Sequence, residues 1–301
     1  MSHEINTTRE ALDALGVNDE TLSQESKEFF DENGFLVIPM SESRLAALGI
    51  DLQEQRDLVQ KWLDLEGPLG GREGKEDTVT AANPLEPNAK RLANMVDKEA
   101  AFRRLVTIPE VLAATHHVLK DEIKLSSLNM REPAPGQNQR KHIEWAPRSK
   151  DSDPYAGVLT FLFIDDSDLE NGPLQVIPGT HKKFGWPDDY FDPFDTHPDE
   201  ITLTAPAGTL VCMNVHLWHG GTKNLSGRRR RTQCINFRRR SLPQLLNQKR
   251  YLSPATANQL TSAERYLLAT RDEDPIQEAA GVGVAAMYAE AYGKPIEKPD
   301  S

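Results

Sequence analysis

The middle of the chain contains a series of short runs of aliphatic, aromatic and β-branched residues. Clusters of Pro, Gly, Asn and Asp separate these runs from one another. The runs cover residues 123–131, 158–164, 174–177, 201–205, 209–219 and 231–240. This composition is typical of β-strands joined by turns, and many short strands in succession predict a sandwich or a barrel. We therefore expect a β core at about residues 123–240.

Helical patterns flank this β core on both sides. Ser23 begins one pattern that ends just before Gly34, and the apolar run at residues 35–39 indicates a short buried strand. Further helices are expected at residues 44–65, 98–105, 109–119 and 285–292. The helical parts thus extend over about residues 22–120 and 242–292.

Two polar stretches lack a helical or strand period. Residues 1–20 are polar, and we expect them to be loosely held, as chain ends usually are. Residues 67–88 are rich in Gly, Pro and charged residues, which indicates a long loop that could close over a site as a lid. Because no internal repeat is present, we expect residues 1–301 to form a single domain.

Composition and charge exclude several classes of protein. The chain has no run of about 18 apolar residues, so we expect no membrane span, and its first residues do not resemble a secretory signal. Cys212 and Cys234 form no disulfide framework, which favours a reducing, cytoplasmic location. The net charge of −11 argues against non-specific nucleic-acid binding, although arginines cluster at residues 228–231 and 238–240.

His142 and Glu144 stand two residues apart in a segment that we expect to be extended. On a strand, such residues point to the same face, so an imidazole and a carboxylate would be presented together. His219 ends the strand-like run at residues 209–219 and offers a third ligand. Two histidines and one carboxylate, with open positions left over, form the facial triad of non-haem iron(II) oxygenases. The pattern therefore predicts a metal site.

A triad of this kind also arises by chance, because a histidine on a strand is more often a hydrogen-bonded structural residue than a ligand. The remaining histidines of interest fall in an expected helix, in a turn, or at a strand position of the wrong parity: His116, His117, His181 and His216. We assign those residues structural roles. The segments that surround the triad distinguish it from a chance pattern.

Four segments resemble the phytanoyl-CoA dioxygenase-like family of iron(II)/2-oxoglutarate oxygenases, in the family's order. They are residues 29–39 (FFDENGFLVIP), residues 142–145 (HIEW), residues 171–181 (NGPLQVIPGTH) and residues 219–226 (HGGTKNLS). The third segment is the most specific, because it is long and closely matches a family stretch that holds no metal ligand. The resemblance covers roughly residues 22–240.

The resemblance implies an α+β fold with a double-stranded β-helix core of the jelly-roll, cupin-like type, flanked by N- and C-terminal helices. It implies that His142 and His219 bind iron(II), with Glu144 standing where the family usually has aspartate. It also implies 2-oxoglutarate and O2 as co-substrates. The substrate would be a small organic molecule that is hydroxylated or otherwise oxidised.

The family holds the far carboxylate of 2-oxoglutarate with an arginine after the distal histidine. A guanidinium suits a carboxylate because it can form two parallel hydrogen bonds. Alignment from His219 points to Arg230, and Arg228 is the runner-up because it has the same strand parity. By the same parity, Arg229 and Arg231 would point away from the site into solvent.

Other interpretations stay open at this point. A cupin-like metalloenzyme of another type would use similar ligands without 2-oxoglutarate, and a β-roll binding module with a vestigial site would not be an enzyme. A hydrolase is disfavoured, because the chain has no Gly-x-Ser-x-Gly motif. The sequence leaves the substrate open, as it does the association of identical chains into an oligomer.

Overall fold

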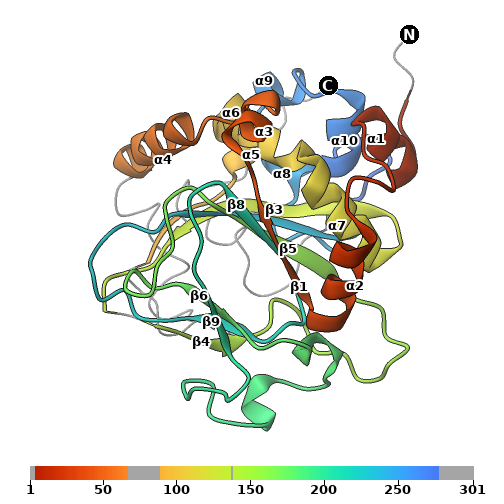
Figure 1. Ribbon diagram of the computed structural model, residues 1–301. Helices are drawn as coiled ribbons and strands as arrows, with labels where there is room; N and C mark the ends of the chain where they lie inside the picture. Colours follow the sequence, from red (N-terminus) through yellow and green to blue (C-terminus); the bar gives the residue numbers. More distant parts are fainter. Residues whose placement is uncertain (1–3, 67–88, 137, 278–301) are drawn as a thin grey trace.

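The computed structural model describes residues 4–66, 89–136 and 138–277. The loop or lid expected at residues 67–88 and the helix expected at residues 285–292 lie outside the described residues. Within the described part, the chain forms a mixed α/β fold with two antiparallel sheets, as expected (Figure 1). No described helix has the length and apolar character that crossing a membrane requires.

A large sheet and a small sheet make up the β part. The large sheet has the order β1-β8-β5-β10-β3-β2, and the small sheet has the order β4-β9-β6-β7. The large sheet comprises β1 (Phe35–Pro39), β2 (Lys90–Leu92), β3 (Ile123–Glu132), β5 (Gly157–Phe163), β8 (Thr209–Asn214) and β10 (Thr232–Arg239). The small sheet comprises β4 (Gln139–His142), β6 (Leu174–Val176), β7 (Ile201–Leu203) and β9 (His219–Gly221). From β3 to β10 the chain therefore passes repeatedly from one sheet to the other.

Most of the helices cover the face of the large sheet that is turned away from the small sheet (Figure 1). The helices before the β core are α1 (Thr8–Ala14), α2 (Gln24–Asn33), α3 (Glu42–Ala47), α4 (Leu52–Glu66), α5 (Met95–Lys98), α6 (Ala100–Arg103) and α7 (Pro109–Leu119). The helices after it are α8 (Gln248–Tyr251), α9 (Pro254–Ala257) and α10 (Ser262–Leu268). Short 3-10 turns occur at η1 (Arg104–Thr107), η2 (Thr180–Lys182) and η3 (Pro187–Asp189).

The two faces of the large sheet belong to two apolar cores. On β10, Ile235 and Phe237 are fully buried in the core that the helices share. On the other face, Leu159 of β5 packs in a core that also contains Val176 of the small sheet, and Cys234 of β10 packs against that core. Burying an apolar side chain of this size contributes roughly 1.5–3 kcal/mol. The alternation along β10 thus fixes which of its side chains face the small sheet.

Local capping signals set the ends of two predicted helices. The hydroxyl of Ser23 accepts a hydrogen bond from the backbone N–H of Ser26 and starts α2, as expected of an N-cap. Gly34 ends α2 with φ at +80°, a conformation that glycine adopts without strain. Pro109 occupies the first turn of α7, whose bounds match the predicted helix.

Three expectations about the helical part are wrong. The first 20 residues are not loose throughout, because α1 carries a capping box between Thr7 and Glu10. The helix expected at residues 44–65 is interrupted, since Asp51 Oδ1 accepts from the N–H groups of Gln53 and Glu54 and starts a new helix there. The helix expected at residues 98–105 breaks at Glu99, whose backbone is extended.

Candidate metal centre

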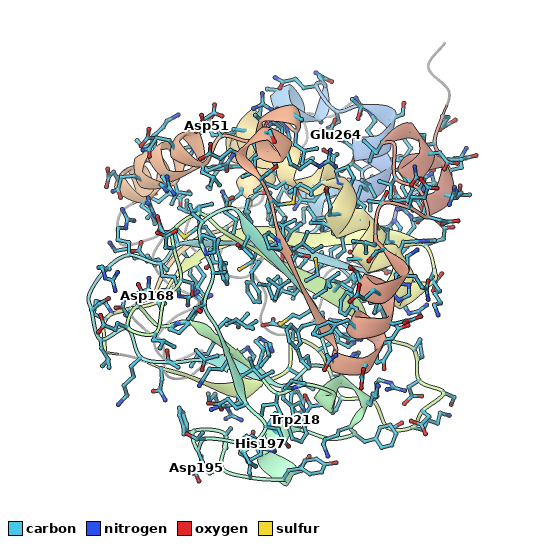
Figure 2. The ribbon with its side chains drawn as sticks, viewed as in Figure 1. Asp51, Asp168, Asp195, His197, Trp218 and Glu264 are labelled. Atoms are coloured by element: carbon cyan, nitrogen blue, oxygen red, sulfur yellow. The ribbon has the colours of Figure 1, made fainter. Side chains whose placement is uncertain are left out.

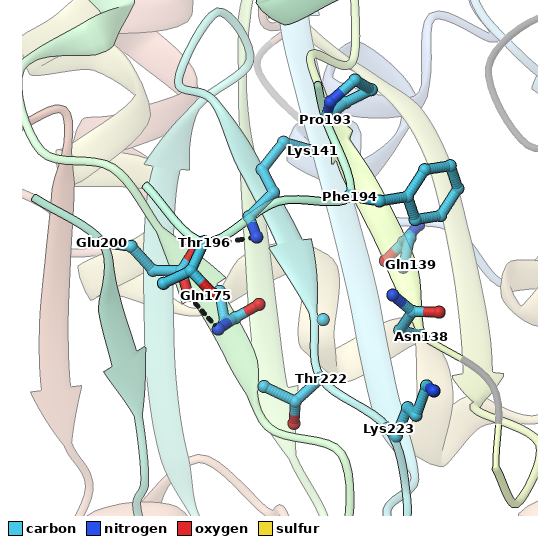
Figure 3. Close-up of a pocket in the computed structure, with 11 residues that line it drawn as sticks. Asn138, Gln139, Lys141, Gln175, Pro193, Phe194, Thr196, Glu200, Thr222 and Lys223 are labelled. Atoms are coloured by element: carbon cyan, nitrogen blue, oxygen red, sulfur yellow. Dashed lines mark hydrogen bonds and ion pairs between the residues drawn. The ribbon is translucent and has the colours of Figure 1, made fainter. Parts of the chain in front are cut away.

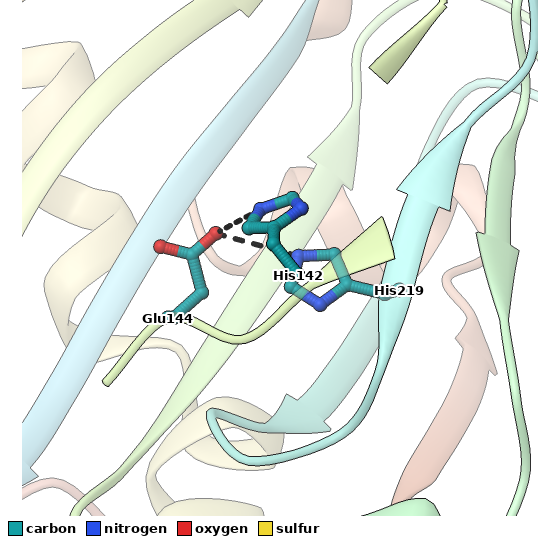
Figure 4. A group of neighbouring side chains, drawn as sticks. All are labelled: His142, Glu144 and His219. Carbon is teal, nitrogen blue, oxygen red and sulfur yellow. Dashed lines mark hydrogen bonds and ion pairs between the residues drawn. The ribbon is translucent and has the colours of Figure 1, made fainter. Parts of the chain in front are cut away.

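The three predicted ligands converge where β4 meets β9 (Figure 4). His142, the last residue of β4, is the register partner of His219, the first residue of β9. Their ring centroids lie 4.2 Å apart at an interplanar angle of 48°. One ligand atom each from His142, Glu144 and His219 lies within 4.8 Å of the others. Across residues 4–66, 89–136 and 138–277, no other trio of His, Cys, Asp or Glu side chains is grouped in this way.

His219 reaches the centre by a route that differs from the expected one. A single strand over residues 209–219 is wrong, because β8 ends at Asn214. The side chain of Asn214 accepts a hydrogen bond of 3.0 Å from the backbone N–H of His216, which stabilises a turn. This turn carries the chain from the large sheet to the small one. His219 therefore opens β9 opposite His142 instead of closing β8.

Glu144 lies beyond the end of β4, so the strand alternation does not position it as expected. Its backbone N–H donates to Val215 O at 2.8 Å, which ties it to the turn before β9. Its Oε1 atom lies 3.2 Å from His142 Nε2 and 3.3 Å from His219 Nε2. One carboxylate oxygen thus faces both imidazole rings (Figure 4).

Backbone carbonyl groups fix the orientation of both rings. Nδ1 of His142 lies 2.9 Å from Arg140 O, and Nδ1 of His219 lies 2.9 Å from Leu217 O. Because a carbonyl oxygen can only accept, each Nδ1 carries the hydrogen, and the neutral ring presents a lone pair at Nε2. Two lone pairs and a carboxylate oxygen then point at one another. A shared cation stabilises such an arrangement, so the donor set fits a metal ion.

The protonation states at the centre favour metal binding. Burial by itself would raise the pKa of the Glu144 carboxyl, but its close contacts with the rings of His142 and His219 outweigh it and hold that pKa well below the usual range. Burial lowers the pKa of His219, and the neighbouring His142 lowers it further. An ionised carboxylate and a neutral imidazole are the forms that bind a metal.

The two predicted 2-oxoglutarate arginines lie in different environments. Arg230 is 4% exposed, and its Nη1 atom donates to the hydroxyl of Thr232 at 3.1 Å. Arg228 is an exposed side chain that pairs with Asp168 at 2.8 Å. Cys234, on the inner face of β10, lies within electrostatic range of both Arg230 and Glu144. Arg230 is thus buried on the side of the metal centre, and this favours Arg230 over Arg228 as the candidate for binding 2-oxoglutarate.

The expectation that Arg229 and Arg231 are solvated is wrong for Arg231, and Arg229 is only partly exposed. Arg231 donates from Nε and Nη2 to the two carboxylate oxygens of Asp165, each at 2.8 Å, and its side chain is 9% exposed. Arg229 forms a similar two-bond contact with Glu132 at 2.9 and 2.7 Å. Strand parity fails at these positions because β10 begins only at Thr232.

The histidines assigned to structural roles lie apart from the triad. His116 and His117 are part of α7, and His216 is in the turn before β9, where its Nδ1 lies 3.1 Å from Asn214 Oδ1. His181 is buried in η2, with its Nε2 atom 3.3 Å from Asp31 O. Burial lowers the pKa of His181 and of His216 to about 4. Both rings are therefore neutral core residues at ordinary pH.

An aromatic segment covers the small sheet beyond the metal centre. Trp218, the residue before His219, is 2% exposed, and the rings of Tyr190 and Phe191 lie 4.8 and 5.8 Å from it, centroid to centroid. Phe191 also contacts the ring of His197 at 5.2 Å. Figure 2 shows Trp218 and His197 in the same region of the molecule. His197 thus belongs to this aromatic cover and is not one of the three ligands.

A polar pocket lies beside the small sheet (Figure 3). Lys141 and Gln175 line it, and each is the strand neighbour of a residue that faces the large sheet, so the pocket is on the outer side. Lys141 Nζ lies 2.7 Å from Glu200 Oε2, and both side chains are 6% exposed. Gln175 also donates to Glu200. Glu200 therefore balances the charge of Lys141, while Lys223 adds a second positive charge to the lining.

Arg238 and Trp145 were not singled out from the sequence. The Cζ atom of Arg238 lies 4.4 Å from the centroid of the Trp145 ring, and Trp145 directly follows Glu144. Arg238 shares its strand parity with Cys234, so it is on the face of β10 that is turned toward the small sheet. In the sequence, only this shared parity indicates that Arg238 faces the small sheet. The parity is hard to recognise because Arg238 belongs to a run of three arginines at residues 238–240.

Comparison with known proteins identifies the family. Residues 30–232 match the model of the family described as phytanoyl-CoA dioxygenase. The chain belongs to the phytanoyl-CoA dioxygenase family. This match spans the candidate metal centre, the small sheet, the strands of the large sheet that precede β10, and most of the helices before the β core.

Individual relatives of this family are distant in sequence. The peroxisomal phytanoyl-CoA dioxygenase of Bos taurus is 26% identical over 237 residues, which cover 71% of this chain and 68% of the relative. An L-proline trans-4-hydroxylase of Streptomyces griseoviridis is 27% identical over 48% of this chain and 65% of its own length. The crystal structure of HygX from Streptomyces hygroscopicus, with nickel and 2-oxoglutarate bound, superposes with a TM-score of 0.56 at 16% identity. That superposition covers 72% of this chain and 87% of HygX, and it supports the fold.

Membership of the phytanoyl-CoA dioxygenase family establishes the reaction class. The protein is a non-haem, iron(II)- and 2-oxoglutarate-dependent dioxygenase, an oxidoreductase that also uses O2. The predictions of family, enzyme class and cofactors are thereby confirmed. The family assignment also disfavours the alternatives of a metalloenzyme without 2-oxoglutarate and of a non-enzymatic binding module.

Proposed function

We propose that this dioxygenase holds iron(II) with His142, Glu144 and His219 and binds 2-oxoglutarate with Arg230. The observation that carries the proposal is the position of Glu144 Oε1, 3.2 and 3.3 Å from the Nε2 atoms of the two histidines. Both Nδ1 atoms contact backbone carbonyls, so Nε2, which faces Glu144, is the atom that each ring would present to the metal. This arrangement supports a facial triad with open positions for co-substrates.

Each side chain has a defined task in this proposal. Bound iron(II) would supply the oxidative chemistry. His142 and His219 donate neutral nitrogen ligands, while Glu144 adds the negative charge that favours a divalent cation. Arg230 presents a fork of N–H donors to the far carboxylate of 2-oxoglutarate. Phe161, whose ring centroid lies 6.5 Å from that of His219, contributes an apolar wall that limits the access of water.

The finer description of the fold is part of the same proposal. We infer a double-stranded β-helix of the jelly-roll type within a single domain over residues 1–301. The repeated passage of the chain between the two sheets from β3 to β10 supports it. The substrate that we propose is a small organic molecule, which is hydroxylated or otherwise oxidised. A cytoplasmic location stays a prediction from the cysteine content.

An anaerobic titration tests the assignment of the site. Iron(II) is added to the full-length protein, followed by 2-oxoglutarate, and the visible absorption of the iron(II)–2-oxoglutarate complex is recorded. We expect one equivalent of each to bind and His219→Ala to abolish the absorption. An unchanged titration with that variant would contradict the assignment. Succinate release, assayed with iron(II), ascorbate and 2-oxoglutarate across a library of small molecules, then identifies the substrate.

A further inference from the structure

Arg238 is a buried cation on the face of β10 that is turned toward the small sheet. It is 2% exposed, and it lies eight residues after Arg230. Cys234, midway between the two arginines, lies within electrostatic range of both Arg230 and Glu144. Arg238 in turn lies within electrostatic range of Glu144. Arg230 thus lies two residues before β10 and Arg238 lies near the end of that strand, and the metal centre is close to Cys234 between them.

The contacts of Arg238 leave part of its hydrogen-bonding capacity unused. Its guanidinium stacks on Trp145, with Cζ 4.4 Å from the ring centroid, and Nη1 donates to Pro243 O. Its Nε atom is buried and has no hydrogen-bond partner among the residues that the structure describes. Within the same residues, no Asp or Glu forms an ion pair with Arg238. Neighbouring arginines differ, because Arg231, Arg239 and Arg240 pair with Asp165, Asp121 and Asp274.

A buried cation without a counter-ion is costly, and the surroundings of Arg238 reflect this cost. Burial lowers the pKa of its guanidinium to about 9, so the group is still charged at neutral pH. Stacking on Trp145 offsets part of the cost. Asn236, which shares the inner face, is 3% exposed, and its Oδ1 atom also lacks a partner within the described part of the chain. Unused polar atoms therefore gather at this end of β10.

We propose that Arg238 binds a carboxylate of the substrate, with Trp145 as the platform that orients its guanidinium. The proposal rests on the metal centre described above and assigns the substrate to the class of small organic acids. A planar guanidinium recognises a carboxylate through parallel N–H donors, and its stacking on an aromatic ring fixes the plane of recognition. Since Trp145 adjoins Glu144 in the chain, an acid anchored there lies beside the metal centre. Arg230, to which we assign 2-oxoglutarate, lies just before the other end of β10.

Paired acid and amide probes test this inference. The full-length protein is loaded with nickel(II) and saturating 2-oxoglutarate, so that a probe carboxylate cannot occupy the site of 2-oxoglutarate. Dissociation constants are then measured by calorimetry for benzoate against benzamide and for hexanoate against hexanamide. We expect at least one acid to bind about ten-fold more tightly than its amide, a difference of about 1.4 kcal/mol. Tryptophan emission should change in the same titration, and Trp145→Phe should remove that change.

Variants of Arg238 decide the outcome. Arg238→Gln should abolish the preference for the acid over its amide. Arg238→Lys keeps the charge and should retain part of this preference. The lysine variant still tests the inference if the glutamine variant does not fold. Arg9→Gln removes one exposed charge on α1 and should leave the preference intact. A preference that persists in Arg238→Gln, or its absence from the unaltered protein, overturns the inference. Loss of 2-oxoglutarate binding in Arg238→Gln but not in Arg230→Gln also overturns it, and failure to bind nickel(II) overturns the metal centre as well.

Discussion

His142 and His219 are register partners that orient their rings in the same way. In each, Nδ1 lies 2.9 Å from the carbonyl oxygen of the residue two positions earlier, Arg140 or Leu217. Both Nε2 atoms then lie close to Glu144 Oε1. Backbone carbonyls of β4 and of the turn before β9 thus hold the two rings in place. The centre is therefore organised by the fold itself, which keeps the cost of reorganisation on metal binding low.

Removal of any one ligand should abolish tight iron binding. Loss of a group that merely orients a metal ligand costs about 10–100-fold in affinity, so His142→Ala, His219→Ala and Glu144→Gln should each cost more than about 100-fold. Metal content after anaerobic reconstitution measures the effect. His181→Ala is the matched control, because it removes a buried histidine outside the triad, and it should retain its iron. Loss of iron from the control would show that the wrong histidine was chosen.

Arg230→Gln should weaken 2-oxoglutarate binding, whereas Arg228→Gln should not. Truncating one partner of a buried charged pair costs at least about 2 kcal/mol, which raises the dissociation constant about 30-fold or more. Arg228 pairs with Asp168 at the exposed surface, where an ion pair contributes about 0–1 kcal/mol. Calorimetric titration of each nickel(II)-loaded variant with 2-oxoglutarate measures the difference. Equal losses in the two variants would contradict the assignment of Arg230.

Local signals in the sequence are sufficient for some elements and for the choice of the three candidate ligands. The ends of α2 follow from Ser23 and Gly34, because helix caps depend on residues within one turn. The resemblance in several separate segments points to His142, Glu144 and His219, and the fold brings these three side chains together. In both cases the determining residues are close together in sequence or belong to motifs that can be recognised one at a time.

Other features depend on contacts between distant segments and could not be predicted. The strand expected over residues 209–219 is too long, because the turn after Asn214 is buried and mostly apolar and so resembles a strand in sequence. Arg231 was assigned to solvent, yet it pairs with Asp165, which lies 66 positions earlier. The sequence does not distinguish Arg238 from its neighbours, because its stacking on Trp145 arises only when β10 and the segment after β4 are brought together. Tertiary packing overrides the local pattern at each of these positions.

Gly34→Ala should destabilise the fold far more than Gly16→Ala. Both glycines have positive φ, at +80° and +72°, so alanine costs roughly 1–2 kcal/mol of backbone strain at either site. A Cβ atom on Gly34 would lie 2.3 Å from Nδ1 of the buried His181 ring, whereas one on Gly16 would meet nothing within 4 Å. Overpacking adds about 1–3 kcal/mol at Gly34. Urea denaturation of the two variants compares them, and equal losses would show that the His181 ring moves aside freely.

The stability of the fold should fall as the pH drops from about 7 toward 4. Burial lowers the pKa of His181 and of His216 to about 4, whereas the same side chains in the unfolded chain titrate near 6.5. Between these values the unfolded state binds protons that the folded state does not, so the free energy of unfolding decreases with decreasing pH. The loss can reach about 3 kcal/mol for each histidine. Burial would raise the pKa of Asp165, but hydrogen bonds from Arg231 outweigh it and lower that pKa. Protonation of Asp165 at lower pH therefore also decreases the free energy of unfolding.

Urea denaturation of the metal-free protein at several pH values between 7.5 and 4.5 measures this dependence. In His216→Gln one of the two buried imidazoles is gone, so the slope of unfolding free energy against pH should become smaller over this range. The hydrogen bond that His216 makes to Asn214 is lost or weakened as well, and this lowers stability by a similar amount at every pH. The change in slope, and not the change in level, therefore reports the buried imidazole. An unfolding free energy that stays constant between pH 7 and 5 would mean that both rings are protonated without leaving their places in the core.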